Sequence, residues 1–103
     1  DYDSSLGYPD CPGFRCGTSH EFQMFDPICQ KILDVYQKPL IAMECSITAK
    51  RYLNITNEDK AISIIKNLKN KCKKYDGTFS LLWHNSHLEY LKDINLYKKS
   101  IKI

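Results

Sequence analysis

The chain has 103 residues, of which 43% are hydrophobic and 26% are charged, and its formal net charge is +3. These values are typical of globular proteins and exclude the disordered and collagen-like classes. A chain of this length forms a single domain, residues 1–103, and buries about 60–68% of the surface that its unfolded form exposes. The charge is too mild for a nucleic-acid-binding domain, and no apolar run approaches the ~20 residues of a membrane span. We therefore expect neither nucleic acid nor a membrane as a partner.

The cysteines indicate the compartment. There are five of them and no Cys-x-x-Cys pair: Cys11, Cys16, Cys29, Cys45 and Cys72. Disulfide-rich secreted proteins usually carry an even number, so we expect free thiols and a cytoplasmic location. The chain begins Asp1-Tyr2-Asp3, without an initiator methionine or a signal sequence. We expect it to have been processed, trimmed or cut out of a longer polypeptide.

The first quarter of the chain is rich in Gly, Pro, Asp, Ser and aromatic residues, which predicts loop structure. Within it, Phe14–Cys16 is a candidate short strand, and residues 21–27 suit a packed loop as well as a strand. Two apolar runs follow, Ile32–Tyr36 and Leu40–Met43, separated by a Gln-Lys-Pro tripeptide. The second run is continuous, as in a strand covered on both faces. Together they predict a strand, a tight turn and a buried strand.

A helix from about Asn57 to Tyr75 is the clearest element. It begins with an N-cap candidate followed by acidic residues, and lysines fill its far end, where cations favour the helix dipole. We expect these lysines to form a solvated face rather than a phosphate-binding patch. Gly77 provides the stop. Apolar residues recur between these ends at helical spacing: Ala61, Ile64, Ile65, Leu68, Cys72 and Tyr75.

The helix leads directly into a second buried strand, Thr78–Trp83. A strand, a helix and a strand in this order predict a βαβ crossover, in which Leu40–Met43 and Thr78–Trp83 are parallel neighbours. The tail, residues 88–103, fits a final helix. The fold class is therefore α/β. Because parallel strands need helices on both faces, we expect a missing N-terminal half or another chain to cover the remaining surface.

The strand Thr78–Trp83 ends in a histidine, His84. Placing a titratable side chain at the carboxyl end of a parallel strand is how α/β enzymes build sites. Glu44 directly follows the neighbouring strand, so we expect both side chains at the same rim. Two alternatives stay open, a structural histidine and a solvated rim acid. His84 and His87 also form a His-x-x-His spacing, which would hold a metal only with two further ligands, for which His20 and Glu21 are the candidates. We expect no metal to bind to this chain alone.

Two segments, Gly13–Thr18 and Gly77–Ser86, resemble the C-terminal part of the polysaccharide deacetylase family, the NodB-homology carbohydrate esterases. The likeness covers roughly residues 7–88. It implies that this chain is a parallel-strand βαβ fragment resembling the C-terminal half of a distorted (β/α) barrel. It also implies removal of N- or O-acetyl groups from a carbohydrate substrate. The family's metal ligands and catalytic base match nothing here, so the resemblance implies no cofactor in this chain, a divalent metal in the complete protein, and no activity alone.

The same resemblance implies roles for five residues. Arg15 would hold the catalytic base through a planar two-bond contact, although a structural ion pair is the alternative. His84 would be the general acid that protonates the leaving group. Glu44 would pair with His84 and stabilise its protonated form. Leu82 and Trp83 would line the substrate site, with Leu82 at the acetyl methyl group.

A second interpretation belongs to another class of protein. The chain is then a non-catalytic carbohydrate-binding or assembly module. Its aromatic residues would stack on sugars or contact a partner chain: Tyr8, Phe14, Phe22, Phe25 and Trp83.

Overall fold

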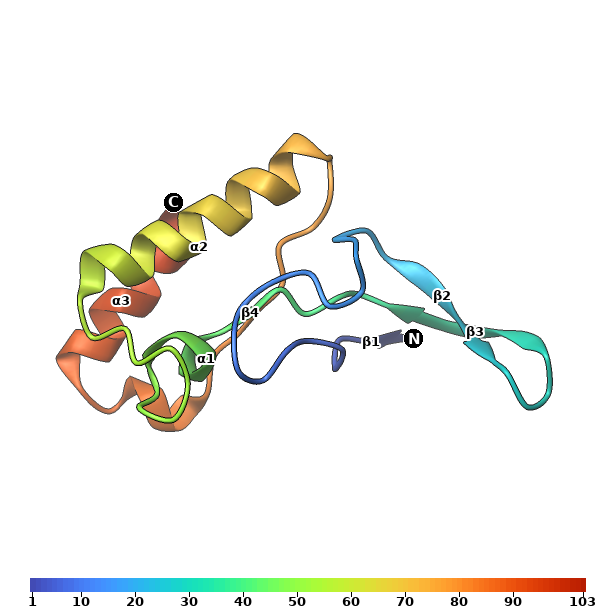
Figure 1. The fold of residues 1–103 in the computed structure, drawn as a ribbon, viewed down its shortest axis with the longest axis horizontal. Coiled ribbons are helices and arrows are strands. Elements are labelled where there is room, and N and C mark those ends of the chain that lie inside the picture. The colour runs from blue at the N-terminus through green and yellow to red at the C-terminus, as the bar shows by residue number, and fades with distance from the viewer.

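The computed structural model describes all 103 residues and shows a mixed α/β fold with two small sheets (Figure 1). One sheet has the strand order β1-β3-β2, and the other pairs β4 with β5. The mixed α/β class predicted from the sequence is confirmed. In chain order the elements are β1 (Tyr2–Asp3), β2 (Phe22–Asp26), β3 (Lys31–Gln37), β4 (Ala42–Met43), α1 (Glu44–Thr48), α2 (Glu58–Lys74), β5 (Leu81–Leu82), a 3₁₀ turn η1 (Asn85–Leu88) and α3 (Leu91–Lys102).

The strands β4 and β5 form the predicted parallel pair, with α2 between them in the sequence. Ala42 lies opposite Leu81, and Met43 lies opposite Leu82. The regular pairing is shorter than the apolar runs because the amides of Ile41 and Ala42 both donate to the carbonyl oxygen of Ser80, at 3.1 and 3.2 Å. After Met43 the chain turns at once into α1. The short pair therefore places the residues that come after each strand at one edge.

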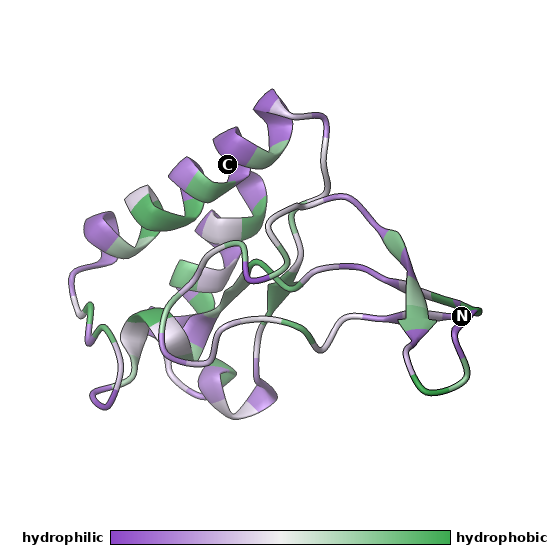
Figure 2. Cartoon of the chain, turned by 45° about the vertical axis from the view of Figure 1, so that its right-hand side comes forward, coloured by the Kyte–Doolittle hydropathy of each residue, from purple (hydrophilic) through white to green (hydrophobic).

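Helix α2 joins the two apolar clusters of the protein. One cluster contains Ile41, Ala42, Leu68 and Cys72, and the other contains Ile47, Ala61, Ile65 and Leu96. Because side chains three and four residues apart share a helix face, one stripe of α2 packs on β4 and also on α3. Figure 2 shows the resulting alternation of hydrophobic and hydrophilic residues along α2.

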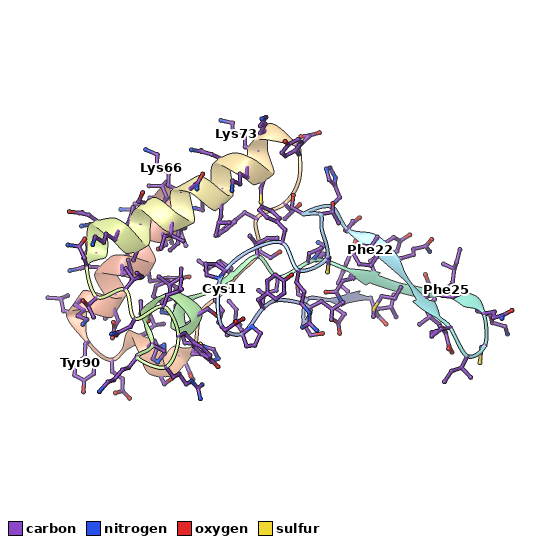
Figure 3. The ribbon with its side chains drawn as sticks, in the orientation of Figure 1. Cys11, Phe22, Phe25, Lys66, Lys73 and Tyr90 are labelled. Carbon is purple, nitrogen blue, oxygen red and sulfur yellow. The ribbon has the colours of Figure 1, made fainter.

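Several of the lysines of α2 form the predicted solvated face. Lys66 and Lys73 point away from the rest of the protein (Figure 3). Lys69 is different, because its ammonium group donates to the carbonyl oxygens of Ser100 and Ile103. Desolvation by burial lowers the pKa of Lys69. This lysine therefore helps to hold α3 against α2.

The ends of α2 lie within one residue of the prediction. Asn57 is the N-cap, and its side chain accepts from the amide of Lys60 at 3.0 Å. At the other end the prediction needs correction, because the left-handed residue is Asp76 (φ 54°) and not Gly77. The amide of Gly77 donates to Cys72 O at 2.8 Å, and that of Asp76 donates to Lys73 O at 3.1 Å. This is a Schellman motif.

The strands β2 and β3 form an antiparallel hairpin that extends away from the helices (Figure 1). The β2 register shifts between Gln23 and Phe25, which indicates a bulge. Strand β1 runs parallel to β3 and covers only Tyr36 and Gln37 of it. The hairpin gives the molecule its elongated shape, with extents of 47 × 28 × 21 Å.

Two local predictions are wrong. Phe14–Cys16 is a turn rather than a strand, because Gly17 (φ 71°) donates its amide to Phe14 O at 3.0 Å. There is also no tight turn between β3 and β4, which belong to different sheets. The chain stays extended through Pro39, since a residue before proline favours extended backbone. The N-terminal segment holds the residues between β3 and β4 in place, because the amide of Lys38 donates to Asp3 O at 2.7 Å.

The final helix starts later than the sequence predicts. Helix α3 begins at Leu91, after η1, rather than at residue 88. No helix of this protein combines the length and the apolar character needed to cross a bilayer. All five cysteines are free thiols; Cys45 and Cys72 are buried and Cys29 is exposed.

Candidate functional site

Glu44 is a buried carboxylate at the junction of β4 and α1, and only 2% of its surface is exposed. Its Oε1 atom accepts three hydrogen bonds. The backbone amide of His84 donates at 2.8 Å, His84 Nδ1 lies at 2.5 Å, and His87 Nδ1 lies at 2.9 Å. Because β4 and β5 are parallel, the residues after each strand meet at the same edge. The predicted pairing of Glu44 with His84 is thus present.

The 3₁₀ turn η1 brings His87 to the same carboxylate. A 3₁₀ helix has about three residues per turn, so side chains at i and i+3 lie above one another. His84 precedes the turn, and its carbonyl oxygen accepts from the amide of His87 at 3.0 Å. The two rings lie edge to face with centroids 5.9 Å apart. Their side chains are 44% and 41% exposed, so both reach solvent while Glu44 does not.

The contacts to Glu44 relate the tautomers of both rings to the charge of the carboxylate. When the carboxylate is ionised it only accepts hydrogen bonds, and both contacts then require a hydrogen on Nδ1 of His84 and on Nδ1 of His87. In the neutral ring, the other nitrogen, Nε2, is then a free acceptor. Charge-assisted hydrogen bonds of this kind are among the stronger ones in proteins. Glu44 Oε2, in contrast, is buried without a partner, which costs about 1–3 kcal/mol.

Cys45 extends the cluster on the buried side. Ligand-type atoms of Glu44, Cys45 and His84 lie within 4.8 Å of one another. Burial, followed by the charge of Glu44, raises the pKa of the Cys45 thiol, which keeps it in the neutral form that binds metals poorly. The 2.5 Å contact between His84 and Glu44 is also a hydrogen-bond length, whereas two ligands of one tetrahedral zinc stand about 3.3 Å apart. The arrangement fits a hydrogen-bonded cluster better than a coordination sphere.

Trp83 supports the histidines from the neighbouring position. Its indole Nε1 donates to His87 O at 3.0 Å, and its ring lies edge to face on Tyr97 with centroids 5.3 Å apart. Leu82, the other predicted substrate contact, is exposed beside it. A cavity of about 600 Å³ lies next to Trp83 and is lined by Glu44, His87 and Tyr90 among others, but neither His84 nor Leu82 lines it. This volume is within the usual range of small-molecule sites.

Arg15 is not joined to this cluster. Its guanidinium is exposed, and Nη1 donates to Gly7 O at 3.0 Å. It makes no hydrogen bond or ion pair with Glu44 or His84. His20 is likewise separate, because its Nε2 contacts Tyr75 O at 2.7 Å. The structure therefore brings together two of the three residues predicted to be catalytic, and the role of Arg15 stays a prediction.

The five aromatic residues of the alternative interpretation are divided between core and surface. Phe14 packs on the cluster around Ile41, and Trp83 packs on the cluster around Ile47. Phe22 and Phe25 lie on the hairpin (Figure 3), and Tyr8 is exposed in the N-terminal segment. These side chains do not form a single stacking surface.

The role of His87 is the feature that the sequence reasoning missed. The His-x-x-His spacing was a sufficient signal that the two rings share a face. The spacing was weighed only as metal ligation, which was not expected of this chain alone, whereas both rings use Nδ1 to bind Glu44. Only the pairing of β4 with β5 identifies the carboxylate as the common acceptor.

Comparisons with protein-family models, with curated proteins and with solved structures find no significant match to this chain.

Proposed function

We propose that this chain supplies the general-acid histidine of a polysaccharide deacetylase-like hydrolase, as the C-terminal half of a distorted (β/α) barrel. The observation that carries the proposal is the hydrogen bond between His84 Nδ1 and Glu44 Oε1 at 2.5 Å. A buried acid that holds an accessible histidine by one nitrogen leaves the other nitrogen for proton transfer.

In this proposal His84 acts through Nε2. The carboxylate of Glu44 fixes the ring and stabilises its protonated form, as Asp does for His in hydrolase triads. Protonated His84 then donates from Nε2 to the leaving nitrogen or oxygen as the acetyl group is cleaved. General acids of this kind contribute about 10²–10⁴-fold to rate.

The other predicted residues have supporting roles. Leu82 and Trp83 directly precede His84 in the chain and would contact the acetylated sugar. Arg15 has free guanidinium N–H groups at the surface and would hold a carboxylate supplied from outside this chain. The chain holds no counterpart of the family's metal ligands, so the divalent ion and the catalytic base would come from another part of the polypeptide or from another chain.

The need for such a partner is supported by the sparse core. Only 15 of the 103 residues are buried, and large apolar side chains remain exposed along the hairpin. The five free thiols favour a reducing compartment such as the cytoplasm.

The experiment compares His84→Ala with wild type in the complete deacetylase-like polypeptide, with acetate release from acetylated chito-oligosaccharides as the readout. We expect kcat to fall by about 10²–10⁴-fold, because the proton donor is lost. KM should change little. The control is His20→Ala, since His20 contacts Tyr75 O and takes no part in the cluster. The isolated chain should release no acetate.

Wild-type turnover by His84→Ala would remove His84 from the mechanism. Turnover by the isolated chain would contradict the need for a second part.

A second candidate, an assembly module, is favoured by the hairpin, on which Phe25 is 57% exposed and Ile28 is 91% exposed. Apolar side chains this exposed typically mark an interaction surface. Binding of a partner chain that is abolished by hairpin substitutions but unaffected by His84→Ala would support this candidate over the enzyme.

A further inference from the structure

We propose that His87 is a positioning residue for His84, which acts by holding the Glu44 carboxylate that both histidines share. The two imidazoles and the amide of His84 all donate to one oxygen, Oε1, while Oε2 has no partner. Glu44, His84 and His87 therefore form one hydrogen-bonded unit, the shared-carboxylate unit. Its catalytic meaning rests on the proposed function, but its geometry does not.

All of the hydrogen bonds to the Glu44 side chain are made to one of its two oxygens, Oε1. A buried carboxylate is stabilised by the donors around it, and here every donor is on the same side. If His87 were removed, Oε1 would keep only the two contacts from His84, and Oε2 would still be unpartnered. The carboxylate could then rotate to offer either oxygen to the His84 ring. His87 holds the oxygen in line with His84 Nδ1.

The exposure of the two rings is a further argument. The side chain of His84 is 44% exposed, so water competes with Glu44 for its ring nitrogens. An imidazole in water is free to exchange between tautomers, and the hydrogen bond made by one nitrogen decides which is populated. A fixed Oε1 keeps the hydrogen on Nδ1 and leaves Nε2 unprotonated in the neutral ring. This is the state from which Nε2 takes up the proton it later donates.

The backbone holds His87 independently of its side chain. The amide of His87 donates to His84 O at 3.0 Å, and its carbonyl oxygen accepts from Trp83 Nε1 at 3.0 Å. Substitution of the His87 side chain leaves both of these hydrogen bonds available. A variant at this position therefore tests the contact to Glu44 rather than the fold of η1.

The test is the ring tautomer of each histidine, measured by ¹⁵N nuclear magnetic resonance on the chain of 103 residues. The pH is raised until the ring signals stop changing, so that the neutral rings are observed. In the wild type we expect His84 and His87 both to carry the hydrogen on Nδ1. His20 is the internal reference, because its Nε2 contacts the carbonyl oxygen of Tyr75 and needs the opposite tautomer to donate to it.

Two variants separate positioning from packing. His87→Asn keeps an N–H donor near the place of Nδ1, so His84 should retain the single Nδ1–H form. His87→Ala removes the donor, and we expect His84 to lose that single form and show a mixture of both tautomers. The near-ultraviolet signal of Trp83 reports whether each variant is folded. In the active polypeptide, His87→Ala should lower kcat by up to about 10²-fold, since small misplacements of a catalytic group cost that much, with KM unchanged and activity restored by Asn.

Three results would overturn the proposal. They are a hydrogen on Nε2 of His87 in the wild type, an unchanged Nδ1–H form of His84 in folded His87→Ala, and loss of that form in His87→Asn. The wild-type measurement is decisive even if the Ala variant does not fold. The tautomers are measured without substrate, so they do not depend on the proposed function. If they are as expected but His84→Ala keeps wild-type turnover, the proposed function is rejected and the shared-carboxylate unit is not.

Discussion

Asp3 is the residue that ties the N-terminal segment to the hairpin. Its Oδ1 atom accepts from Ser5 Oγ at 2.6 Å, from Ser5 N at 2.9 Å and from Gln37 Nε2 at 2.7 Å. Gln37 is fully buried, so this contact satisfies a side-chain amide that has no access to water. The hydrogen bond from the Ser5 side chain, then that from the Ser5 backbone and that from Gln37, lower the pKa of Asp3.

The lowered pKa predicts a pH dependence of stability. Because the pKa of Asp3 is lower in the folded state than its ordinary value of 3.8, its contribution is present above that value and is lost as pH falls through the folded pKa. We expect Asp3→Asn to be less stable than wild type at pH 7, and the difference to narrow below pH 3.8. Urea unfolding at several pH values measures this difference. Ser5→Ala, which removes the largest cause, should follow the same trend, and a gap that is constant with pH would contradict it.

At the scale of elements, Gly77 follows the left-handed residue Asp76 at the end of α2. It must be a glycine because of its surroundings and not because of its backbone conformation. A Cβ atom on Gly77 would lie 1.9 Å from Ser19 Oγ and 2.9 Å from Ser19 Cβ. A backbone hydrogen bond keeps the two segments close together, because Thr78 N donates to Ser19 O at 3.1 Å. Gly77 therefore lets the chain pass the N-terminal segment on its way from α2 to β5.

We predict that Gly77→Ala destabilises the protein by about 1–3 kcal/mol, because overpacking forces the backbone to shift. Ser19→Ala alone should have little effect, since its Oγ has no hydrogen bond to lose. The double variant should recover part of the loss, because the nearest clashing atom is gone while the 2.9 Å contact remains. Urea unfolding of the four proteins gives the coupling energy. Additive effects in this cycle would show that the Ser19 hydroxyl is not the obstacle.

At the scale of the whole molecule, the protein consists of a helical body and a projecting hairpin. Its radius of gyration is 14.9 Å, whereas a compact domain of about 100 residues measures ~13 Å. The hairpin carries apolar side chains outside any core, and the tip of its loop is green, or hydrophobic, in Figure 2. Beyond the two residues covered by β1, the edge of β3 is unpaired. Exposed edges with apolar side chains favour association.

We predict that the isolated chain associates through this hairpin as its concentration rises. Replacing Phe25, Ile28 and Ile32 together by serine should abolish the association while changing stability little, because these side chains are 57%, 91% and 68% exposed. Sedimentation velocity over a concentration series measures the association. Ile65→Ala is the control for the stability measurement. In contrast to the triple variant, it should destabilise the protein by about 2–5 kcal/mol, because it removes a buried side chain. A triple variant that associates like the wild type would place the contact elsewhere.

The sequence by itself determined the elements whose signals are local. The helix near Asn57–Tyr75 was predictable because capping residues and helical spacing act within a few turns. The parallel pairing of Leu40–Met43 with Thr78–Trp83 was predictable because a helix between two continuous apolar runs leaves few other topologies. The same reasoning brought Glu44 and His84 to one edge, since both residues directly follow strands.

Only the tertiary structure decided how these parts are used. The path through Pro39 is held by hydrogen bonds between residues far apart in the sequence, from Lys38 N to Asp3 O and from Leu40 N to Leu6 O. The reason for Gly77 lies in Ser19, far away in the sequence. The shared-carboxylate unit depends on a 3₁₀ turn meeting the end of another strand, so the sequence predicted no role for His87. A side chain's chemical type is local, but its hydrogen-bond partner is decided by packing.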